Sequence, residues 1–331
     1  MSETRNISDI APKIAKDIFK HFLWAYHPKF DDNFKCNNDK HTGGKGNKPK
    51  DTHPVDIVFY YDDPYLGRTI YLNTDLKSYK KDTINSTKLR EAFKSLCMAI
   101  DCARDSSEWR EKFSVDESEQ HEVRGLLFVH NHDNGYDKCF DEAIDKIGLQ
   151  NLPVAPNTTL HFFGPDDIQR LWSIGNDIIR LKGEEELPNN YTFYYPDLVL
   201  CRRQGDVWNQ PATIEALTAP YLIIKHGAVG ANGTGYVIYY NGPCTSPEEF
   251  EYFIDSLSHY QMLESGEKIR IRVTTLDVPD DLKSVFQMAK KKYVKAWGFD
   301  ESREKLLNQI EIERVTSVTS NYNPGDMGWV E

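Results

Sequence analysis

Two strand-like runs joined by a short turn constrain the fold of this chain more than any other feature. Residues 55–61 (VDIVFYY) and residues 68–75 (RTIYLNTD) are rich in the β-branched and aromatic residues that favour strands. The segment between them, DDPYLG, carries the proline and glycine that are typical of a turn. The pattern therefore predicts a β-hairpin, and the fold of the N-terminal half has to be built around it.

Strands and helices alternate on both sides of this hairpin. Apolar residues at a spacing of four predict a helix that Ser8 caps, and Ser86 is expected to cap another. The other elements expected in this half are strands at residues 123–129 and 159–163 and a helix at residues 166–181. Residues 31–53 are polar, lysine-rich and glycine-bearing, which predicts a mobile loop.

An acidic segment at residues 182–190 (KGEEELPNN) ends the apolar pattern of the first half. At roughly 150 residues per domain, a chain of 331 residues suggests two domains, which we expect at residues 1–185 and 186–331. The second half contains a capping box at Ser246 and Glu249, and its expected strands are at residues 191–200, 221–226, 235–241 and 268–275. We therefore expect a C-terminal α/β domain for regulation or interaction, in which residues 235–297 could form half of a ferredoxin-like unit.

Composition excludes several classes of protein. The six cysteines are scattered without a CxxC pair, which argues against a disulfide framework and against a structural zinc site. No apolar run is long enough to span a bilayer, and the N-terminus lacks the apolar segment of a secretory signal. We therefore expect a cytoplasmic protein without membrane association.

The formal net charge of −11 argues against a general nucleic-acid coat. Positive charge nevertheless gathers locally. Residues 33–50 carry five lysines and one acid, and residues 76–94 carry six basic residues and two acids. Because both segments flank the predicted hairpin, the sequence allows a local basic groove in an acidic protein.

Two acids and a lysine are expected to meet at the end of the hairpin. Asp56 begins the first strand, whereas Asp75 and Lys77 lie two positions apart at the end of the second. Side chains at i and i+2 of a strand point to the same face, so Asp75 and Lys77 should project side by side next to Asp56. Carboxylate oxygens and the Leu76 carbonyl could hold Mg²⁺ or Mn²⁺, while the lysine could orient or help deprotonate the water and offset charge at phosphorus. An exposed surface pair is the alternative for these residues.

Asp56 followed by Asp75-Leu76-Lys77 on an adjacent strand resembles the PD-(D/E)xK nuclease superfamily, which has the restriction-endonuclease-like fold. The order of elements over residues 8–180 is similar as well. Pro54-Val55-Asp56 stands where the superfamily has Pro-Asp, and Asp75 stands where Glu is commoner. The resemblance implies an α/β core with a central mixed sheet flanked by helices. It also implies a metal-dependent endo- or exonuclease in which Asp56 and Asp75 bind the metal and Lys77 assists the water.

Other residues are candidates for supporting roles. Some members of the superfamily add an acid from the N-terminal helix; Asp17 is the candidate here, with a solvated helix flank as the stronger alternative. The candidates for contact with nucleic acid are Lys45, Lys48, Lys50, Lys80 and Lys81, with solvated surface lysines as the alternative. His130-Asn131-His132-Asp133 fits a turn at a strand end better than a nuclease motif.

The resemblance implies an effector subunit of a bacterial anti-phage defence system that hydrolyses nucleic acid, with DNA as the expected substrate. A partner such as an ATPase or a helicase would control it, which fits the acidic charge and the absence of a recognisable sequence-reading module. The alternative from another class is a catalytically inactive nuclease-fold scaffold that binds a partner protein. Convergence of Asp56, Asp75 and Lys77 within one coordination sphere discriminates between the two.

Overall fold

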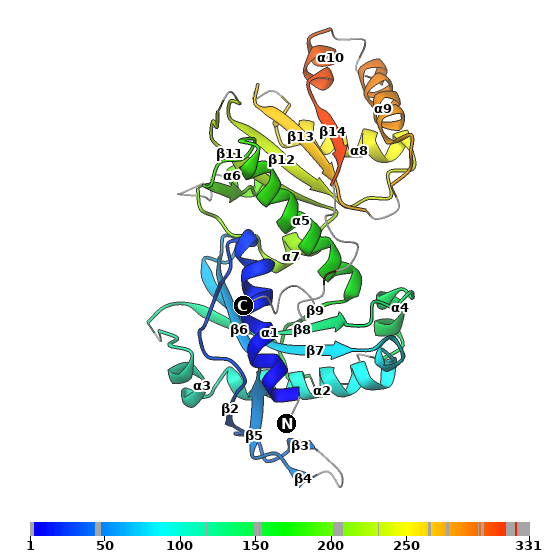
Figure 1. Ribbon diagram of the computed structural model, residues 1–331. Coiled ribbons are helices and arrows are strands. Elements are labelled where there is room, and N and C mark those ends of the chain that lie inside the picture. The colour runs from blue at the N-terminus through cyan, green and yellow to red at the C-terminus, as the bar shows by residue number, and fades with distance from the viewer. Residues whose placement is uncertain are drawn as a thin grey trace. The chain divides into compact units, whose positions relative to one another are not determined.

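The computed structural model describes residues 3–43, 48–116, 118–148, 152, 154–200, 208–230, 232–263, 266–275, 278–296, 298, 301–315 and 322. The chain divides into two compact units, one of residues 1–172 together with 319–331 and the other of residues 173–318. Each unit contains a five-stranded mixed sheet with helices against it (Figure 1). The α/β fold with a central mixed sheet is thereby confirmed, whereas the boundary after residue 185 stays a prediction.

The sheet of the first unit has the strand order β1-β6-β7-β8-β9. Its strands are β1 (Ala25–Tyr26), β6 (Ile57–Asp63), β7 (Arg68–Tyr79), β8 (His121–Asn131) and β9 (Leu160–Phe163). Strand β6 is antiparallel to β1 and to β7, which confirms the predicted hairpin, whereas β7, β8 and β9 run parallel. The parallel pairs are joined by helical connections, as the geometry of parallel strands requires.

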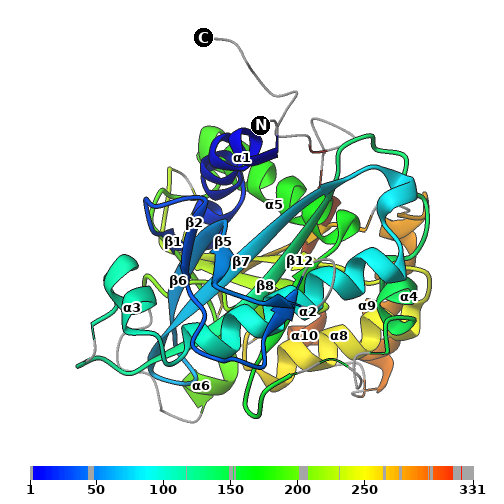
Figure 2. The same cartoon turned by 90° about the horizontal axis from the view of Figure 1, so that it is seen from below.

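Helices cover both faces of this sheet (Figure 2). Helix α1 (Glu3–Asp17) and the 3-10 helix η1 (Phe19–Phe22) lie against one face, on which the Phe19 ring packs 4.5 Å from the Phe59 ring. Helix α2 (Ser86–Ala103) lies against the other face, where its apolar residues share a buried cluster with Val58 and Leu127. The unit is completed by η2 (Lys81–Thr83), α3 (Ser107–Lys112), α4 (Phe140–Asp145) and the start of α5 (Pro165–Gly183).

Both predicted helix caps in the first half are wrong. Helix α1 is already formed at Glu3, so Ser8 lies inside it rather than at its start. Helix α2 is capped by Asn85, whose side chain accepts a hydrogen bond from the Lys88 backbone N–H, and Ser86 is its first residue. Asn85 and Ser86 are adjacent and both residue types are common at helix caps, so composition alone could not decide which of them caps α2.

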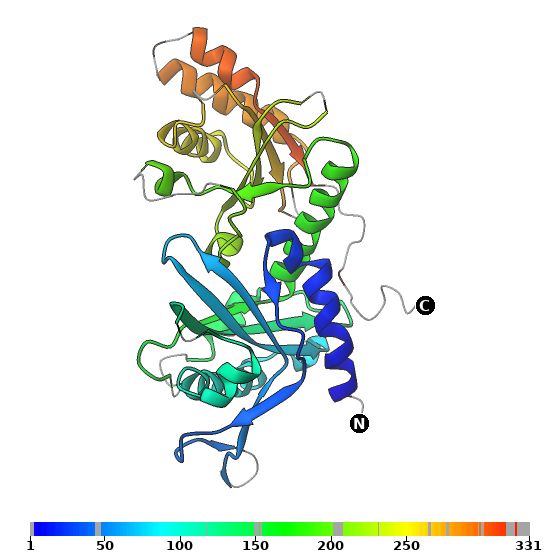
Figure 3. The ribbon, with the colours of Figure 1, turned by 90° about the vertical axis from the view of Figure 1, so that its left-hand side faces the viewer.

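Two short hairpins occupy most of the segment that was predicted as a loop. Strand β2 (Asp32–Lys35) pairs with β5 (Thr52–Val55), and β3 (Thr42–Gly43) pairs with β4 (Lys48–Pro49), both antiparallel. We call residues 32–55 the arm; its β3–β4 hairpin lies at the end farther from the main sheet (Figures 1 and 3). The loop prediction is wrong for the described part because these pairings join distant segments, which local composition does not reveal.

The sheet of the second unit has the order β10-β11-β12-β13-β14. Its strands are β10 (Tyr191–Phe193), β11 (Tyr221–His226), β12 (Gly235–Tyr240), β13 (Lys268–Val273) and β14 (Glu311–Arg314). Its helices are α6 (Pro196–Leu200), α7 (Ile214–Thr218), α8 (Pro247–His259), α9 (Leu282–Ala296) and α10 (Glu301–Asn308). Strands β12, β13 and β14 are parallel neighbours, and β10, β11 and β12 are antiparallel.

Two predictions for this unit are wrong and one is confirmed. The expected strand at residues 191–200 ends at Phe193, because Pro196 starts helix α6. The half ferredoxin-like unit is absent, because β12 and β13 pair directly instead of being split by another strand. The capping box is present: the Ser246 side chain accepts a hydrogen bond from the Glu249 backbone N–H at 3.3 Å. Among the described helices, none combines the length and apolarity needed to cross a membrane.

Candidate active site

Asp56 is the single residue between strands β5 and β6, where the chain bends from the arm into the main sheet. Its backbone N–H donates to the Thr74 carbonyl at 3.3 Å. Its carboxylate accepts a hydrogen bond from the backbone N–H of Leu76 at 2.6 Å, and the residue is only 6% exposed. Asp56 is therefore attached to strand β7 through both its backbone and its side chain.

Strand β7 carries Asp75 and Lys77. The strand was predicted to end at Asp75 but extends to Tyr79, so both residues lie in regular paired structure. Asp75 is in register with Leu127 and Lys77 with Val129 of β8, and the two side chains share one face. The Lys77 ammonium lies 2.5 Å from a carboxylate oxygen of Asp75. The structure thus brings Asp56, Asp75 and Lys77 together at one end of the sheet.

The backbone of Leu76 faces Asp56 because strand β6 begins only at Ile57, one residue after Asp56. Ile57, the first residue of β6, is in register with Thr74, so the part of β7 beyond Thr74 has Asp56 rather than β6 at this edge. The N–H and C=O of one strand residue point to the same edge. The Leu76 carbonyl therefore faces the same side as its N–H, which bonds to the Asp56 carboxylate.

The electrostatics of the three side chains favour an additional cation. Burial and the neighbouring Asp75 raise the pKa of Asp56 to about 7, although the Leu76 N–H and Lys77 act in the opposite direction. Burial would lower the pKa of Lys77, but Asp75 and Asp56 outweigh it and the pKa is raised. Lys77 therefore stays an ammonium ion and balances one carboxylate, while the Asp56 carboxyl keeps its proton up to about pH 7 unless a further cation takes the place of that proton.

These donors suit a hard divalent metal ion. Asp56 and Asp75 offer carboxylate oxygens, and Leu76 adds a carbonyl on the same edge of β7. Mg²⁺ prefers oxygen ligands and keeps several positions for water and phosphate, which a set of two carboxylates and one carbonyl leaves open. Close carboxylates repel one another in a buried site, and a divalent cation between them removes that repulsion. The residues present therefore fit the metal that the sequence suggested.

The described hydrogen bonds and ion pairs of Asp17 do not include Asp56, Asp75 or Lys77. It is the last residue of α1, and its described contacts are a 3.4 Å hydrogen bond from the Tyr322 hydroxyl and the charges of neighbouring lysines. Burial raises its pKa despite that hydrogen bond. Its role as a metal ligand stays a prediction.

The predicted lysines of the arm differ in their surroundings. Lys45 lies outside the described residues, and Lys48 is exposed on β4. Lys50 is half-buried and donates to the Ser95 hydroxyl of α2 at 3.3 Å. Burial lowers its pKa, while Cys36 and then Asp75 act in the opposite direction. The negative charge of Asp75 in the candidate metal site therefore acts to raise the pKa of Lys50.

Lys80 and Lys81 are exposed directly after the end of β7. The backbone N–H of Lys81 donates to the Asp133 carboxylate at 3.1 Å, and Asp133 also accepts from Asn131. This network holds a turn at the end of β8, which agrees with the turn predicted for residues 130–133. Both lysine side chains consequently project to solvent three and four residues beyond Lys77.

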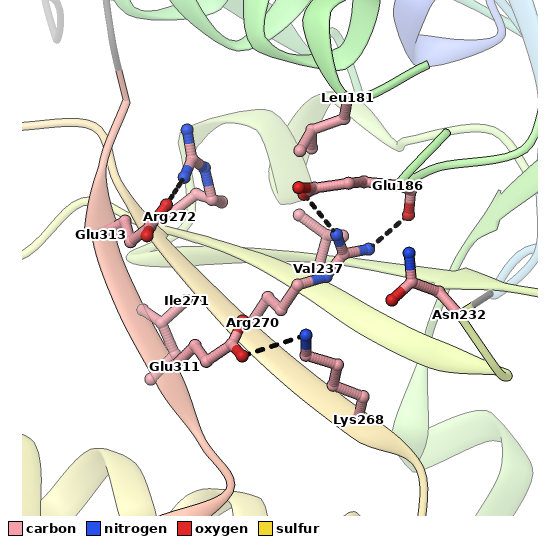
Figure 4. A pocket seen from close by; sticks show the side chains of 10 residues that line it. All are labelled: Leu181, Glu186, Asn232, Val237, Lys268, Arg270, Ile271, Arg272, Glu311 and Glu313. Carbon is pink, nitrogen blue, oxygen red and sulfur yellow. Dashed lines mark hydrogen bonds and ion pairs between the residues drawn. The ribbon is translucent and has the colours of Figure 1, made fainter. Parts of the chain in front are cut away.

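A pocket in the second unit contains several cations, and each of them has an acidic partner (Figure 4). The pairs are Lys268 with Glu311 at 3.0 Å, Arg270 with Glu186 at 2.8 Å, and Arg272 with Glu313 at 2.7 Å. Arg272 also contacts the buried carboxylate of Asp177 at 2.6 Å. The pocket is thus a set of internal ion pairs and does not compete with the first unit as an active site.

Comparison with known proteins points to the same half of the chain. A family model described as the GAPS4 protein PD-(D/E)XK nuclease domain matches residues 1–167. The matched range is half of the chain and includes the arm, Asp56 and strand β7. No curated protein and no solved structure matches the chain.

Proposed function

Because the chain belongs to the GAPS4 PD-(D/E)XK nuclease family, an anti-phage defence family, we propose that it is a Mg²⁺- or Mn²⁺-dependent nuclease and a defence effector. The observation that carries this proposal is the convergence of the three side chains: the Asp56 carboxylate on the Leu76 N–H at 2.6 Å, and the Lys77 ammonium 2.5 Å from Asp75. This arrangement combines two oxygen donors with one cation, as phosphodiester hydrolysis requires.

Asp56, Asp75 and the Leu76 carbonyl would hold the metal ion. When bound, the ion polarises a phosphoryl oxygen and lowers the pKa of water. Asp56 has to lose its proton first, because burial and Asp75 raise its pKa to about 7. Its hydrogen bond from Leu76 fixes one carboxylate oxygen and leaves the other for a metal ion.

Lys77 would act as a cation rather than as a base. Its raised pKa keeps the ammonium protonated, so it does not accept a proton from water at neutral pH. It can instead donate hydrogen bonds to the attacking water and to the negative charge that develops on the phosphoryl oxygens. Its 2.5 Å contact with Asp75 holds the ammonium beside the metal-binding carboxylate.

The substrate we propose is DNA, with RNA as the alternative outcome of the test. Lys48, Lys80 and Lys81 are exposed, and Lys50 interacts with the charge of Asp75. Lysines at these positions would bind the phosphate backbone and orient it without reading its sequence. This supports a nuclease whose selectivity comes from control by another protein.

We further propose that a partner protein such as an ATPase or a helicase controls the activity. The net charge of −11 disfavours unassisted binding of the whole chain to nucleic acid. The second unit, which lies outside the family match, would provide the regulatory or interaction surface. A catalytically inactive scaffold is the rival function, and its prediction is binding without cleavage.

The test is a cleavage assay of the full chain with its partner on plasmid, linear duplex and single-stranded substrates. We expect cleavage with Mg²⁺ or Mn²⁺, little turnover with Ca²⁺ because of its looser coordination, and none for Asp75→Asn. Asp82→Asn, which changes an exposed acid after the motif, is the matched control and should cleave normally. Absence of cleavage by the wild-type complex under all these conditions would establish the scaffold function instead.

A further inference from the structure

Four side chains with metal-binding atoms meet between the arm and helix α2. Cys36 follows β2, His41 precedes β3, His53 lies in β5, and Cys102 lies near the end of α2. One ligand atom from each lies within 4.8 Å of the others. Three of the four residues are buried, and His53 is fully so. We call these four residues the Cys2His2 cluster.

Four separations within the cluster match those expected of a tetrahedral metal site. The two sulfurs are 3.8 Å apart, and His41 Nδ1 lies 3.5 Å from the sulfur of Cys36 and 3.4 Å from that of Cys102. His41 Nδ1 and His53 Nε2 are 3.3 Å apart. Zn–S bonds of about 2.3 Å and Zn–N bonds of about 2.05 Å at tetrahedral angles give separations of about 3.8, 3.6 and 3.3 Å for S–S, S–N and N–N pairs. These four separations agree with zinc geometry, and all four ligand atoms lie within 4.8 Å of one another, so an ion would lie at a point between them.

Neighbouring groups orient the ligand atoms toward that point. The far nitrogen of His41, Nε2, lies 3.0 Å from the Asp101 carboxylate, which also accepts from the Asn38 side chain at 3.0 Å. A proton on Nε2 leaves Nδ1 with a free electron pair directed at the cluster, and carboxylates commonly support zinc-binding histidines in this way. The backbone N–H of Asn37 donates to the sulfur of Cys102 at 3.4 Å and lowers the pKa of that thiol, whereas burial raises it to about 11.

We propose that Cys36, His41, His53 and Cys102 form a structural Zn²⁺ site that fastens the arm to helix α2. Two sulfur and two nitrogen ligands in a tetrahedron favour zinc over Mg²⁺ or Ca²⁺. Because four protein ligands complete the coordination, no position remains for water or substrate, so the site is structural and separate from the Asp56–Asp75 site.

Zinc would add to the packing that already holds the arm, since Phe34 and Val55 belong to the buried cluster that α2 lines. Among the described residues, β2 and β5 pair with each other and so do β3 and β4, and isolated two-stranded hairpins are marginally stable in water. Three of the ligands come from the arm and the fourth from α2, so the ion joins segments that no sheet connects. His53 lies three residues before Asp56, so zinc binding also determines how β5 enters the candidate active site.

The proposal corrects the sequence-based argument against zinc. That argument rested on the absence of a CxxC pair, but the fold gathers cysteines 66 positions apart. The local signal that was available is the Cys36-x4-His41 spacing, followed by His53 twelve residues after His41. Cys102, on a helix whose apolar side explains its burial, carried no such signal.

The first test measures metal in the full-length wild-type protein, purified with a tag that contains no histidines and without chelators. Elemental analysis should find about one zinc per chain. Replacement by Co²⁺ should give the visible absorption of a tetrahedral site together with a thiolate-to-cobalt charge-transfer band. A folded, active wild-type protein without zinc, or with a Cys36–Cys102 disulfide in its place, overturns the proposal.

Variants assign the ligands. Cys36→Ser and Cys102→Ser should each lose most of the zinc and the charge-transfer intensity, whereas Cys139→Ser, which changes an exposed cysteine outside the cluster, should keep both. Retention of full zinc by either cluster variant contradicts the assignment. Asp75→Asn should keep its zinc while losing cleavage, so failure of the nuclease proposal and failure of the zinc proposal are distinguishable. If the cluster variants do not fold, the wild-type metal content and cobalt spectrum still decide.

Discussion

The backbone N–H of Leu76 donates to the carboxylate of Asp56 at 2.6 Å, and this bond joins the two sequence segments of the candidate active site. It occupies the edge of β7 at the point where β6 no longer continues. A bend in the chain therefore takes the place of a paired strand residue, and a carboxylate takes the place of a backbone acceptor. The metal-binding chemistry proposed for this end of the sheet depends on the Asp56 carboxylate lying where a β6 backbone carbonyl would otherwise pair with Leu76.

Lys77→Ala should lower the cleavage rate by about 10²–10³-fold, because one donor to the developing negative charge is lost. Metal binding should persist, since Lys77 is not a ligand in the proposed site. The measurement is single-turnover cleavage with the partner present, together with calorimetric titration of Mn²⁺. Lys146→Ala, which alters an exposed lysine beside Glu142 outside both basic segments, serves as the control and should cleave at the wild-type rate. Equal rates for the two variants would remove Lys77 from the catalytic machinery.

In the protein without divalent metal, the contribution of Asp56 to the free energy of unfolding should fall as the pH rises from about 4 to about 7. The pKa of Asp56 is 3.8 as the unperturbed value and about 7 in the folded protein, through burial and Asp75. The folded state thus holds a proton that the unfolded state has already released, and this stabilisation is complete below pH 4 and lost above pH 7. Asp56→Asn cannot ionise, so its stability relative to wild type should increase across that range in urea unfolding. A difference that does not change with pH would contradict the raised pKa.

Replacing Lys48, Lys80 and Lys81 together by alanine should weaken binding of nucleic acid regardless of sequence. Each lost phosphate contact lowers the slope of log K against log salt by about 0.9 for duplex DNA. The measurement is fluorescence anisotropy over a series of salt concentrations, with a variant that cannot cleave. The matched control replaces three exposed lysines of helix α9, Lys283, Lys291 and Lys295. A slope changed by the α9 variant and not by the first would move the binding surface to the second unit.

Asp177→Ala should destabilise the second unit by roughly 3–5 kcal/mol, as expected when one member of a buried ion pair is removed. Asp177 is fully buried and accepts from Arg272 at 2.6 Å and from the Tyr239 hydroxyl at 3.1 Å. Glu184→Ala, which removes an exposed partner of Arg180 directly after the end of α5, should cost less than about 1 kcal/mol. Urea denaturation followed by circular dichroism measures both. A loss as small for Asp177→Ala as for Glu184→Ala would show that Glu313 alone satisfies Arg272.

The central hairpin and the approach of Asp56, Asp75 and Lys77 to one another could be predicted because both depend on local rules. Strands alternate their side chains with a period of two, and one tight turn connects Asp56 to the strand of Asp75 and Lys77. The predicted strand was four residues too short at its end, since Leu76–Tyr79 remain paired with β8. That pairing comes from a strand more than forty residues later, which hydrophobic pattern in the hairpin cannot disclose.

The arm and its Cys2His2 cluster could not be predicted in the same way. Lys35 pairs with Thr52 across a segment rich in glycine and lysine, a composition that indicates a loop. The fourth member of the cluster comes from a helix that is distant in sequence. In the second unit, Pro196 was read as part of a strand, although proline at the first position of a helix is common and explains α6.

The position of Asp56 as the only residue between β5 and β6 has a mechanical consequence. A ligand that rotated the arm would turn the peptide units on either side of the proposed metal-binding carboxylate of Asp56. Occupancy of the arm and occupancy of the metal site then share a coupling free energy, and such coupling is reciprocal. If nucleic acid bound to the arm changes the affinity of the site for a divalent ion, the ion changes the affinity for nucleic acid by the same factor.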